Sequence, residues 1–145
     1  MKLPTEIIEI LSEPELAPEG VYELEVEGVN GGVSQNGHSY RIVVDFQVTS
    51  GEYEGYKMKS VFAIYNPDNF TSQSIGGMLF RSMLLALGIS ESQITEEFDT
   101  DILIGSRLKG YVVKEKSVVN YPAHNRVSRY MPLTAGGERE IDKAE

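Results

Sequence analysis

The sequence predicts a mainly β fold, in which five antiparallel strands surround a core and a helical insertion separates the third strand from the fourth. Apolar and polar residues alternate along YRIVVDFQV (40–48) and KMKSVFAIY (57–65), and the segment between them contains two glycines. This pattern is typical of neighbouring antiparallel strands. The next segment, 72–88, instead repeats apolar residues at helical spacing. A helix therefore interrupts the run of strands.

The two central strands are expected to have one apolar face and one basic face, because side chains alternate along a strand. The apolar set should form a wall of the core and comprises Ile42, Val44, Phe46, Met58, Phe62 and Ile64. The opposite face carries Arg41, Lys57 and Lys59, with Tyr65 at its end. The fold should therefore be built on the first face and the function on the second.

The N-terminal part begins with an apolar and acidic segment, 1–19, which is expected to hold one turn of helix or an edge strand. A half-buried strand should follow from Val21, because its glutamates alternate with Tyr22, Leu24 and Val26. The alternation breaks near Gly28, which predicts a β-bulge. The glycines and asparagine at 30–32 and the polar residues 34–37 indicate turns.

The helix should begin at a cap on Thr71 or Ser72 and end at Gly88, a natural C-terminal cap. Its buried face is expected to comprise Ile75, Met78, Leu79, Met83, Ala86 and Leu87, widened by Phe80 and Leu84. Gly76 and Gly77 indicate either that the regular helix starts after them or that a close backbone contact needs them. A capping box at Ser90 predicts a second short helix.

The last two strands are predicted at 107–115 and 126–133, with a loop around 120–122. In the first of them Leu108, Gly110 and Val112 should face inward, and Arg107, Lys109 and Tyr111 outward. A helix between the third and fourth of five strands is the order of a small Greek-key barrel of the OB type. We therefore predict a five-stranded OB-like barrel.

Length and composition indicate one domain, here divided into an acidic segment (1–19), the OB-like domain (20–135) and a polar tail (136–145). The 145 residues include no cysteine, which excludes disulfides and thiolate metal sites. The N-terminus has no signal-peptide pattern, and no apolar run has the length of a membrane span. A cytoplasmic location is expected, without membrane contact.

Charge is unevenly distributed along the chain. The net charge is −9, but residues 1–27 alone hold eight glutamates and one lysine. Residues 28–135 hold ten acidic and ten basic residues. Clustering of those bases therefore decides what the surface attracts. We hypothesise that the acidic segments 1–19 and 136–145 cover the basic face when no nucleic acid is present.

Signatures of catalysis are few. His38 and His124 lie in predicted loops without the spacing of paired ligands or of a catalytic triad. The acidic stretch 96–101 lacks the fixed ligand positions of an EF-hand. We therefore expect no catalytic residue, no metal and no cofactor, and we expect that the protein is not an enzyme.

The stronger pattern is one of binding. Cations that follow a nucleic-acid backbone, together with aromatic rings that stack on bases, form the grooves of single-strand binders. The outward faces of two strands repeat this composition, and a third cluster occurs near the C-terminal end of the domain. The candidate residues are Arg41, Lys57, Lys59, Tyr65, Arg107, Lys109, Tyr111, Arg126, Arg129 and Tyr130. The first two strand clusters are expected to form one continuous outer surface, whereas solvation of a barrel exterior is the alternative explanation.

Four stretches carry a resemblance to a known family: 18–22 (PEGVY), 46–55 (FQVTSGEYEG), 86–88 (ALG) and 126–130 (RVSRY). In order and spacing they resemble small phage proteins from replication and recombination modules, many of them known only as a domain of unknown function. Those proteins look like distant relatives of phage single-stranded-DNA-binding OB-fold proteins. Their acidic tails often end in an aromatic or apolar residue, whereas the tail here is diluted by Arg139 and Lys143.

The resemblance implies sequence-tolerant binding of single-stranded DNA in phage replication or recombination, without a cofactor. It also implies a homodimer and work beside a recombinase, annealing protein, helicase or polymerase. Two alternatives remain open. One is a protein-interaction module that uses the sheet edge and the acidic N-terminus, and the other is a carbohydrate-binding OB domain that uses the tyrosines. Only binding to nucleic acid should weaken steeply with salt.

Overall fold

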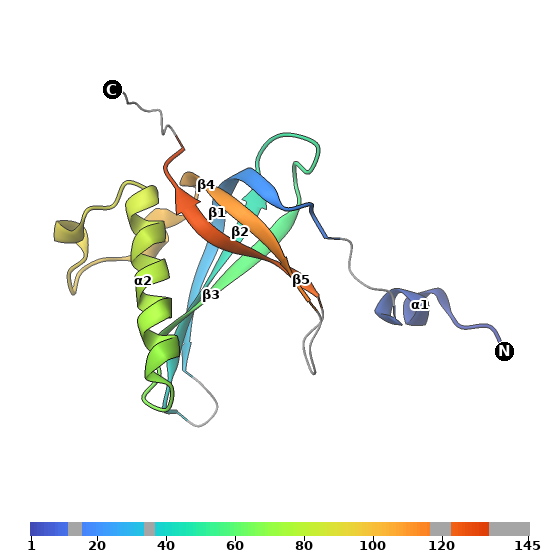
Figure 1. Cartoon of the computed structure of the whole chain (residues 1–145), viewed down its shortest axis with the longest axis horizontal. Coiled ribbons are helices and arrows are strands. Elements are labelled where there is room, and N and C mark those ends of the chain that lie inside the picture. The colour runs from blue at the N-terminus through green and yellow to red at the C-terminus, as the bar shows by residue number, and fades with distance from the viewer. Residues whose placement is uncertain (12–15, 34–36, 117–122, 134–145) are drawn as a thin grey trace.

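The computed structural model describes residues 1–8 in full, 9–11 by their backbone, and 16–33, 37–116 and 123–133 (Figure 1). The described elements are α1 (Thr5–Leu11), β1 (Gly20–Val33), β2 (Tyr40–Val48), β3 (Lys57–Tyr65), α2 (Phe70–Ala86), two 3₁₀ helices (Glu91–Gln93 and Thr100–Leu103), β4 (Arg107–Glu115) and β5 (His124–Met131). The prediction of a mainly β fold with a helix between the third and fourth strands is confirmed. The predicted tail (136–145) and the loop at 120–122 lie outside the described residues.

The five strands form one antiparallel sheet in the order β3-β2-β1-β4-β5. The long strand β1 pairs with β2 from Leu24 to Val33 and with β4 from Gly20 to Glu25. It therefore lies in the middle of the sheet, and its register with β2 shifts between Val26 and Gly28. The predicted bulge near Gly28 is confirmed, and Glu27 is its extra residue.

The predicted turn at 30–32 is wrong, because β1 continues through these residues to Val33. Gly31 lies opposite Ile42, and a side chain at this position would collide with the ring of Tyr40. Glycine in a strand often marks a site where another group approaches the backbone closely, and Gly31 is such a site.

The core lies on the side of the sheet that the alternation predicted. Its buried members come from all five strands, from α2 and from the second 3₁₀ helix, and the largest fully buried side chains are Phe46, Phe62, Leu24, Met83, Leu84, Leu103 and Leu108. Two predicted core residues, Ile42 and Ile64, are only partly buried. They lie toward the end of the β2–β3 pair that is distant from its connecting turn.

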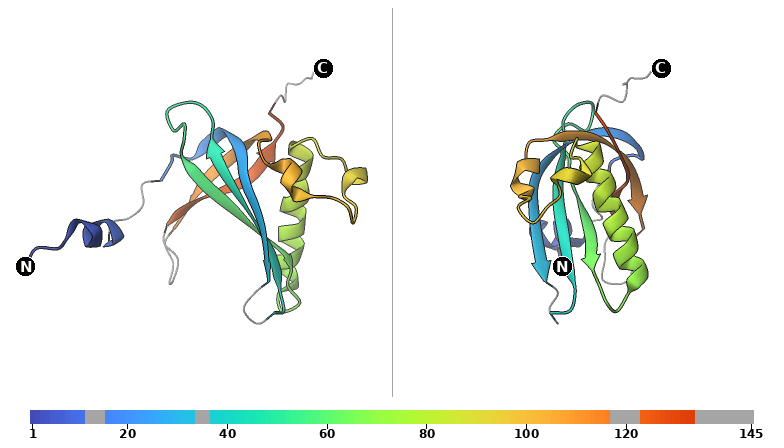
Figure 2. Two further views of the ribbon diagram at one scale, coloured as in Figure 1. Left: turned by 180° about the vertical axis from the view of Figure 1, so that it is seen from behind. Right: turned by 90° about the vertical axis from the view of Figure 1, so that its left-hand side faces the viewer.

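Helix α2 lies alongside β3 (Figure 2). Its N-cap is Asn69, whose side chain accepts a hydrogen bond from the Ser72 amide at 3.0 Å, so the predicted caps at Thr71 and Ser72 are wrong. A Cβ at Gly76 would collide with the backbone of Ala63, which explains a glycine inside the helix. Gly88 ends α2 with a positive φ of 91°, as predicted.

The close contact at Gly76 determines which face of α2 is buried. Gly76, Met83, Leu84 and Ala86 face the sheet. The predicted burial of Ile75 and Met78 is wrong, because their exposed fractions are 49% and 61%. Phe70 (73%) and Leu85 (50%) are exposed on the same helix.

The segment that precedes β1 is attached to β5 by one buried side chain. The Asn125 amide donates to Ala17 O at 3.0 Å and to Val113 O at 3.3 Å. Its Oδ1 accepts from the Ala17 amide at 3.0 Å and from the Tyr56 hydroxyl at 2.7 Å. All four hydrogen-bonding positions of this amide are thus used, as a buried amide requires.

No helix in the described part of the chain combines the length and the apolar character that crossing a membrane requires.

Candidate functional site

The two edge strands of the sheet, β3 and β5, lie on either side of an open edge. No backbone ladder joins them among the described residues, but side chains connect them. The Tyr130 hydroxyl on β5 donates to Ser60 Oγ on β3 at 2.7 Å. The ring of Tyr130 also lies 6.0 Å from that of Phe62 and 6.3 Å from that of Phe46. The sheet is therefore curved, and within the part of the chain that the structure describes its two edge strands contact each other through side chains but not through backbone hydrogen bonds.

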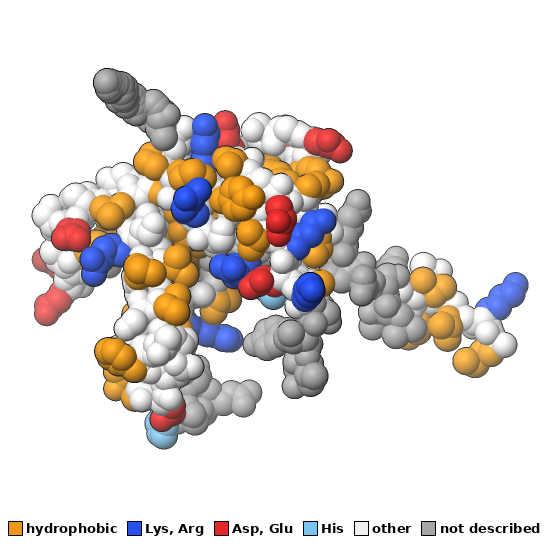
Figure 3. All heavy atoms as spheres, viewed as in Figure 1, with side chains coloured by type: hydrophobic (Ala, Val, Ile, Leu, Met, Phe, Trp, Pro, Cys, Tyr) orange, Lys and Arg blue, Asp and Glu red, His pale blue; other side chains and the backbone are white. Residues whose placement is uncertain are grey.

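Beside this contact the edges separate around a cleft of about 780 Å³. Its floor is largely apolar and includes Phe46, Met58, Phe62, Val127 and Leu79 of α2. Its polar lining residues include Lys57 and Lys59 from β3 and His124 and Arg126 from β5, together with Glu27 and Asp45. Figure 3 shows Lys and Arg side chains gathered over β5 and its surroundings, with a few acidic side chains among them.

The predicted continuous surface across the two strand clusters is interrupted. Strand β1 lies between β2 and β4, and its outward residues are glutamates. Glu23 and Glu25 lie opposite Lys109 and Arg107 in the register of β1 with β4. The cations of β3 and β4 are therefore separated by acidic residues on the side of β1.

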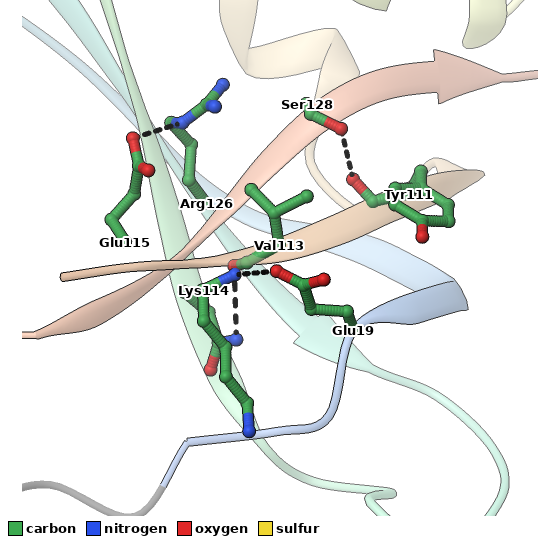
Figure 4. Close-up of polar contacts among 8 residues, drawn as sticks. Glu19, Tyr111, Val113, Lys114, Glu115, Arg126 and Ser128 are labelled. Atoms are coloured by element: carbon green, nitrogen blue, oxygen red, sulfur yellow. Dashed lines mark hydrogen bonds and ion pairs between the residues drawn. The ribbon is translucent and has the colours of Figure 1, made fainter.

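Three candidate cations form ion pairs, two of them with glutamates of β1 and one with a glutamate of β4. Lys57 Nζ lies 3.3 Å from Glu27 Oε1, and Arg107 Nε lies 3.0 Å from Glu25 Oε1. Arg126 Nε donates to Glu115 Oε1 at 2.8 Å (Figure 4). All three pairs are solvent-accessible, so each stabilises the fold by less than about 1 kcal/mol. A competing anion can replace such a carboxylate at low cost.

Four candidate cations have no ion pair with any described residue. They are Arg41 on β2, Lys59 on β3, Lys109 on β4 and Arg129 on β5. Lys59 and Arg129 belong to the two strands of the open edge. Lys109 is half-buried, and it faces Glu23.

A register shift places Tyr65 differently from the prediction. Arg41 pairs with Ala63, but Tyr40 pairs with Tyr65, so Ile64 is an extra residue of β3. Directly paired residues share a face of a sheet. Tyr65 thus lies on the side of Tyr40 and out of alternation with Lys59. The expectation that it shares the face of the β3 lysines is wrong.

A second bulge rearranges the cluster on β5. Tyr111 pairs with Arg129 and Val112 with Val127, which makes Ser128 the extra residue. Its hydroxyl donates to Tyr111 O at 3.1 Å (Figure 4). Arg129 is consequently exposed, on the same side as Tyr111. Tyr130 is only 6% exposed, so the expectation of a surface ring that stacks on bases is wrong for this residue.

Burial has an electrostatic consequence for Tyr130. It raises the pKa of the Tyr130 hydroxyl to about 12, against smaller opposing effects of the Ser60 hydrogen bond and the Arg126 charge. A phenolate in this position would lack hydration. Tyr130 is therefore a neutral member of the core at physiological pH.

Sequence reasoning missed several residues of the cleft, notably Tyr56 and Asn125. Tyr56 directly precedes Lys57, and its hydroxyl reaches Asn125. A buried asparagine in an otherwise alternating strand was the available signal, since polar groups in a core need specific partners. His124, expected to be a solvated loop residue, instead opens β5 and lines the cleft.

No group of three or more acidic or histidine side chains that could hold a metal ion occurs among residues 1–8, 16–33, 37–116 and 123–133. The chain matches no protein-family model and no curated protein.

Proposed function

We propose that this protein binds single-stranded DNA without strong sequence preference, along the open edge between β3 and β5. The observation that carries the proposal is the position of the cations. Lys57 and Lys59 on one edge strand and Arg126 on the other line the same apolar cleft. Cations beside an apolar surface are what the phosphates and bases of a single strand require.

The strand order supports an OB-like barrel. Strands β1 to β3 form a meander, β1 also pairs with β4, and α2 lies between β3 and β4. OB-folds are partly open Greek-key barrels whose second and third strands and nearby loops bind oligonucleotides. The same region here contains Arg41, Lys57 and Lys59. The resemblance to phage single-stranded-DNA-binding proteins agrees with this proposal.

The path that we propose runs across β5 and avoids β1. Arg126 and Arg129 extend the basic surface from the cleft toward Tyr111 of β4. Arg107 and Lys109 lie outside the path, because they do not line the cleft and they face Glu25 and Glu23 of β1. The paired acids lower the net attraction, so we expect weak binding that depends strongly on salt.

The test is a fluorescence titration of the full chain with labelled oligo-dT at two salt concentrations. Arg126→Ala should weaken binding and lower the salt slope by about one ion. Arg81→Ala is the matched control, because Arg81 is also an exposed arginine with one ion pair, to Glu91, but lies on α2. Equal affinities and slopes for both variants and the parent would refute the proposed site.

The aromatic residues provide an independent test. Tyr111→Ala should cost about 1–3 kcal/mol of binding free energy and leave the salt slope unchanged, because stacking releases no counterions. Tyr65→Ala should change the affinity little, since the bulge at Ile64 removes it from the path. Tyr111→Phe should retain most of the affinity. The reverse order of the two alanine variants would favour the surface predicted from alternation alone.

A protein-interaction module is the second candidate. The exposed apolar residues of α2 favour it, since Phe70, Met78, Leu85 and Ile75 are all about half exposed or more. Binding through this face should be insensitive to salt. If the unmodified protein does not bind oligo-dT at low salt, the protein-interaction module becomes the favoured function.

A further inference from the structure

We propose that the cleft between β3 and β5 binds an acidic, apolar helix, and that its ligand is the chain's own helix α1. This inference concerns a contact within one chain and stands without the proposed binding of DNA. It rests on four observations: the isolation of α1, the apolar floor of the cleft, complementary charge and a short tether.

Helix α1 needs a partner for its stability. It has seven residues, whereas isolated helices shorter than about 12–15 residues are marginal in water. The side chains of residues 1–8 are nevertheless exposed. Figures 1 and 2 show α1 apart from the sheet and from α2. A surface that covers its apolar residues would stabilise it.

The cleft supplies an apolar surface of the required kind. Leu3, which precedes α1, and Ile7 of α1 are 44% and 39% exposed. Among the apolar residues that line the cleft, Val61 is 55% exposed and Leu16 and Leu79 are partly exposed, whereas Met58, Phe62 and Val127 are buried. An amphipathic helix commonly binds by placing its apolar side chains in such a groove.

Charge at the rim favours an acidic ligand. Residues 1–19 contain five glutamates and one lysine, and α1 itself contains Glu6 and Glu9. The rim carries Lys57, Lys59 and Arg126. It also carries Glu27, which forms an ion pair with Lys57, and Asp45, which lies opposite Lys59 in the register of β2 with β3. Lys59 has no ion pair with a described residue, so it is the best placed partner for a glutamate of α1.

The chain between α1 and the cleft, from Leu11 to Leu16, is the tether, and it is short. Leu16 lines the cleft, and Ala17 is held on both backbone groups by Asn125. Leu11, the last residue of α1, is five residues before Leu16, so the chain between them spans at most about 17 Å. A short tether gives an effective concentration in the millimolar range, so that even weak contacts suffice.

The chain contains no tryptophan, so one introduced tryptophan reports on α1 alone. In the full-length Ile7→Trp protein without nucleic acid, we expect tryptophan emission to be blue-shifted and shielded from acrylamide. Adding the double substitution Lys57→Glu/Lys59→Glu should expose the tryptophan. The ratio of bound to free helix should fall about three- to tenfold, as expected for two solvent-exposed ion contacts.

Arg107→Glu/Lys109→Glu is the matched control, because it reverses two cations that lie outside the cleft. It should leave the tryptophan shielded. Glu6→Lys/Glu9→Lys changes only α1 and should expose the tryptophan even if the sheet variant fails to fold. Combining the reversed α1 with the reversed β3 lysines should restore shielding, which a general loss of structure would not do.

Equal acrylamide quenching in the Ile7→Trp protein, in its Lys57→Glu/Lys59→Glu variant and in its Glu6→Lys/Glu9→Lys variant would overturn the inference. Shielding that appears only at concentrations where light scattering detects a dimer would also overturn it, since the helix would then come from a second copy. Oligo-dT should expose the tryptophan if both proposals hold. If the proposed function fails, oligo-dT leaves the tryptophan shielded, and the two failures are thereby distinguished.

Discussion

The cations of β4 and those of β5 both point outward from the sheet, but they have different neighbours. Arg107 and Lys109 face Glu25 and Glu23 of β1 across a regular ladder. Arg126 and Arg129 belong to an edge strand, beyond which lie an apolar cleft and the lysines of β3. Both groups include ion-paired cations, Arg107 with Glu25 and Arg126 with Glu115, so what distinguishes the β5 group is its place beside the cleft and not the absence of neighbouring acids.

The largest expected effect concerns the floor of the open edge. Phe62→Ala should reduce the free energy of unfolding by about 3–5 kcal/mol, because Phe62 is fully buried and contacts the rings of Phe80 and Tyr130. Val61→Ala, the exposed neighbour on the same strand, should change it by less than about 0.5 kcal/mol. Urea denaturation of both variants gives the comparison. A loss below about 1 kcal/mol for Phe62→Ala would show that the edges are not held by this packing.

The next effect concerns the contact that closes the edge. The pKa of Tyr130 is raised to about 12, against about 10 in the unfolded chain. The folded state thus retains a proton that the unfolded state loses. The stabilisation is fully present below pH 10 and is lost as the pH rises through 12. The loss should be about 2–3 kcal/mol.

Denaturation of the parent and of Tyr130→Phe at several alkaline pH values measures this difference. Other tyrosines and lysines titrate in the same range, but they do so in both proteins. The Phe variant should therefore lose less stability between pH 10 and 12. Parallel curves would contradict a buried, protonated Tyr130.

The smallest effect separates the two sides of β1. Glu27→Gln removes the acid that compensates Lys57 at the cleft, and it should tighten oligo-dT binding about two- to fivefold at low salt. Glu25→Gln removes the equivalent partner of Arg107 away from the cleft, and binding should stay unchanged. Titration of both variants with oligo-dT at low salt tests this difference. Equal tightening by both would mean that DNA also crosses the β4 side of the sheet.

The sequence by itself determined much of the fold. Alternation predicted the bounds of β2, β3 and β4 and the inward direction of Leu24, Val44, Phe46 and Leu108. It succeeded because the direction of a side chain along a regular strand depends only on residue parity. Gly28 and Gly88 were likewise predictable, because a bulge and a helix C-cap have local requirements.

Only the tertiary structure decided which faces meet. Strand order placed the β1 glutamates between the two predicted basic clusters, and no local pattern encodes which strands are neighbours. One-residue bulges at Ile64 and Ser128 reversed the parity of Tyr65, Arg129 and Tyr130. The close approach of Gly76 to Ala63 turned Met78 outward. Each of these features depends on a partner distant in the sequence, and so the chain could suggest residue types for the candidate site but not which of those residues lie together.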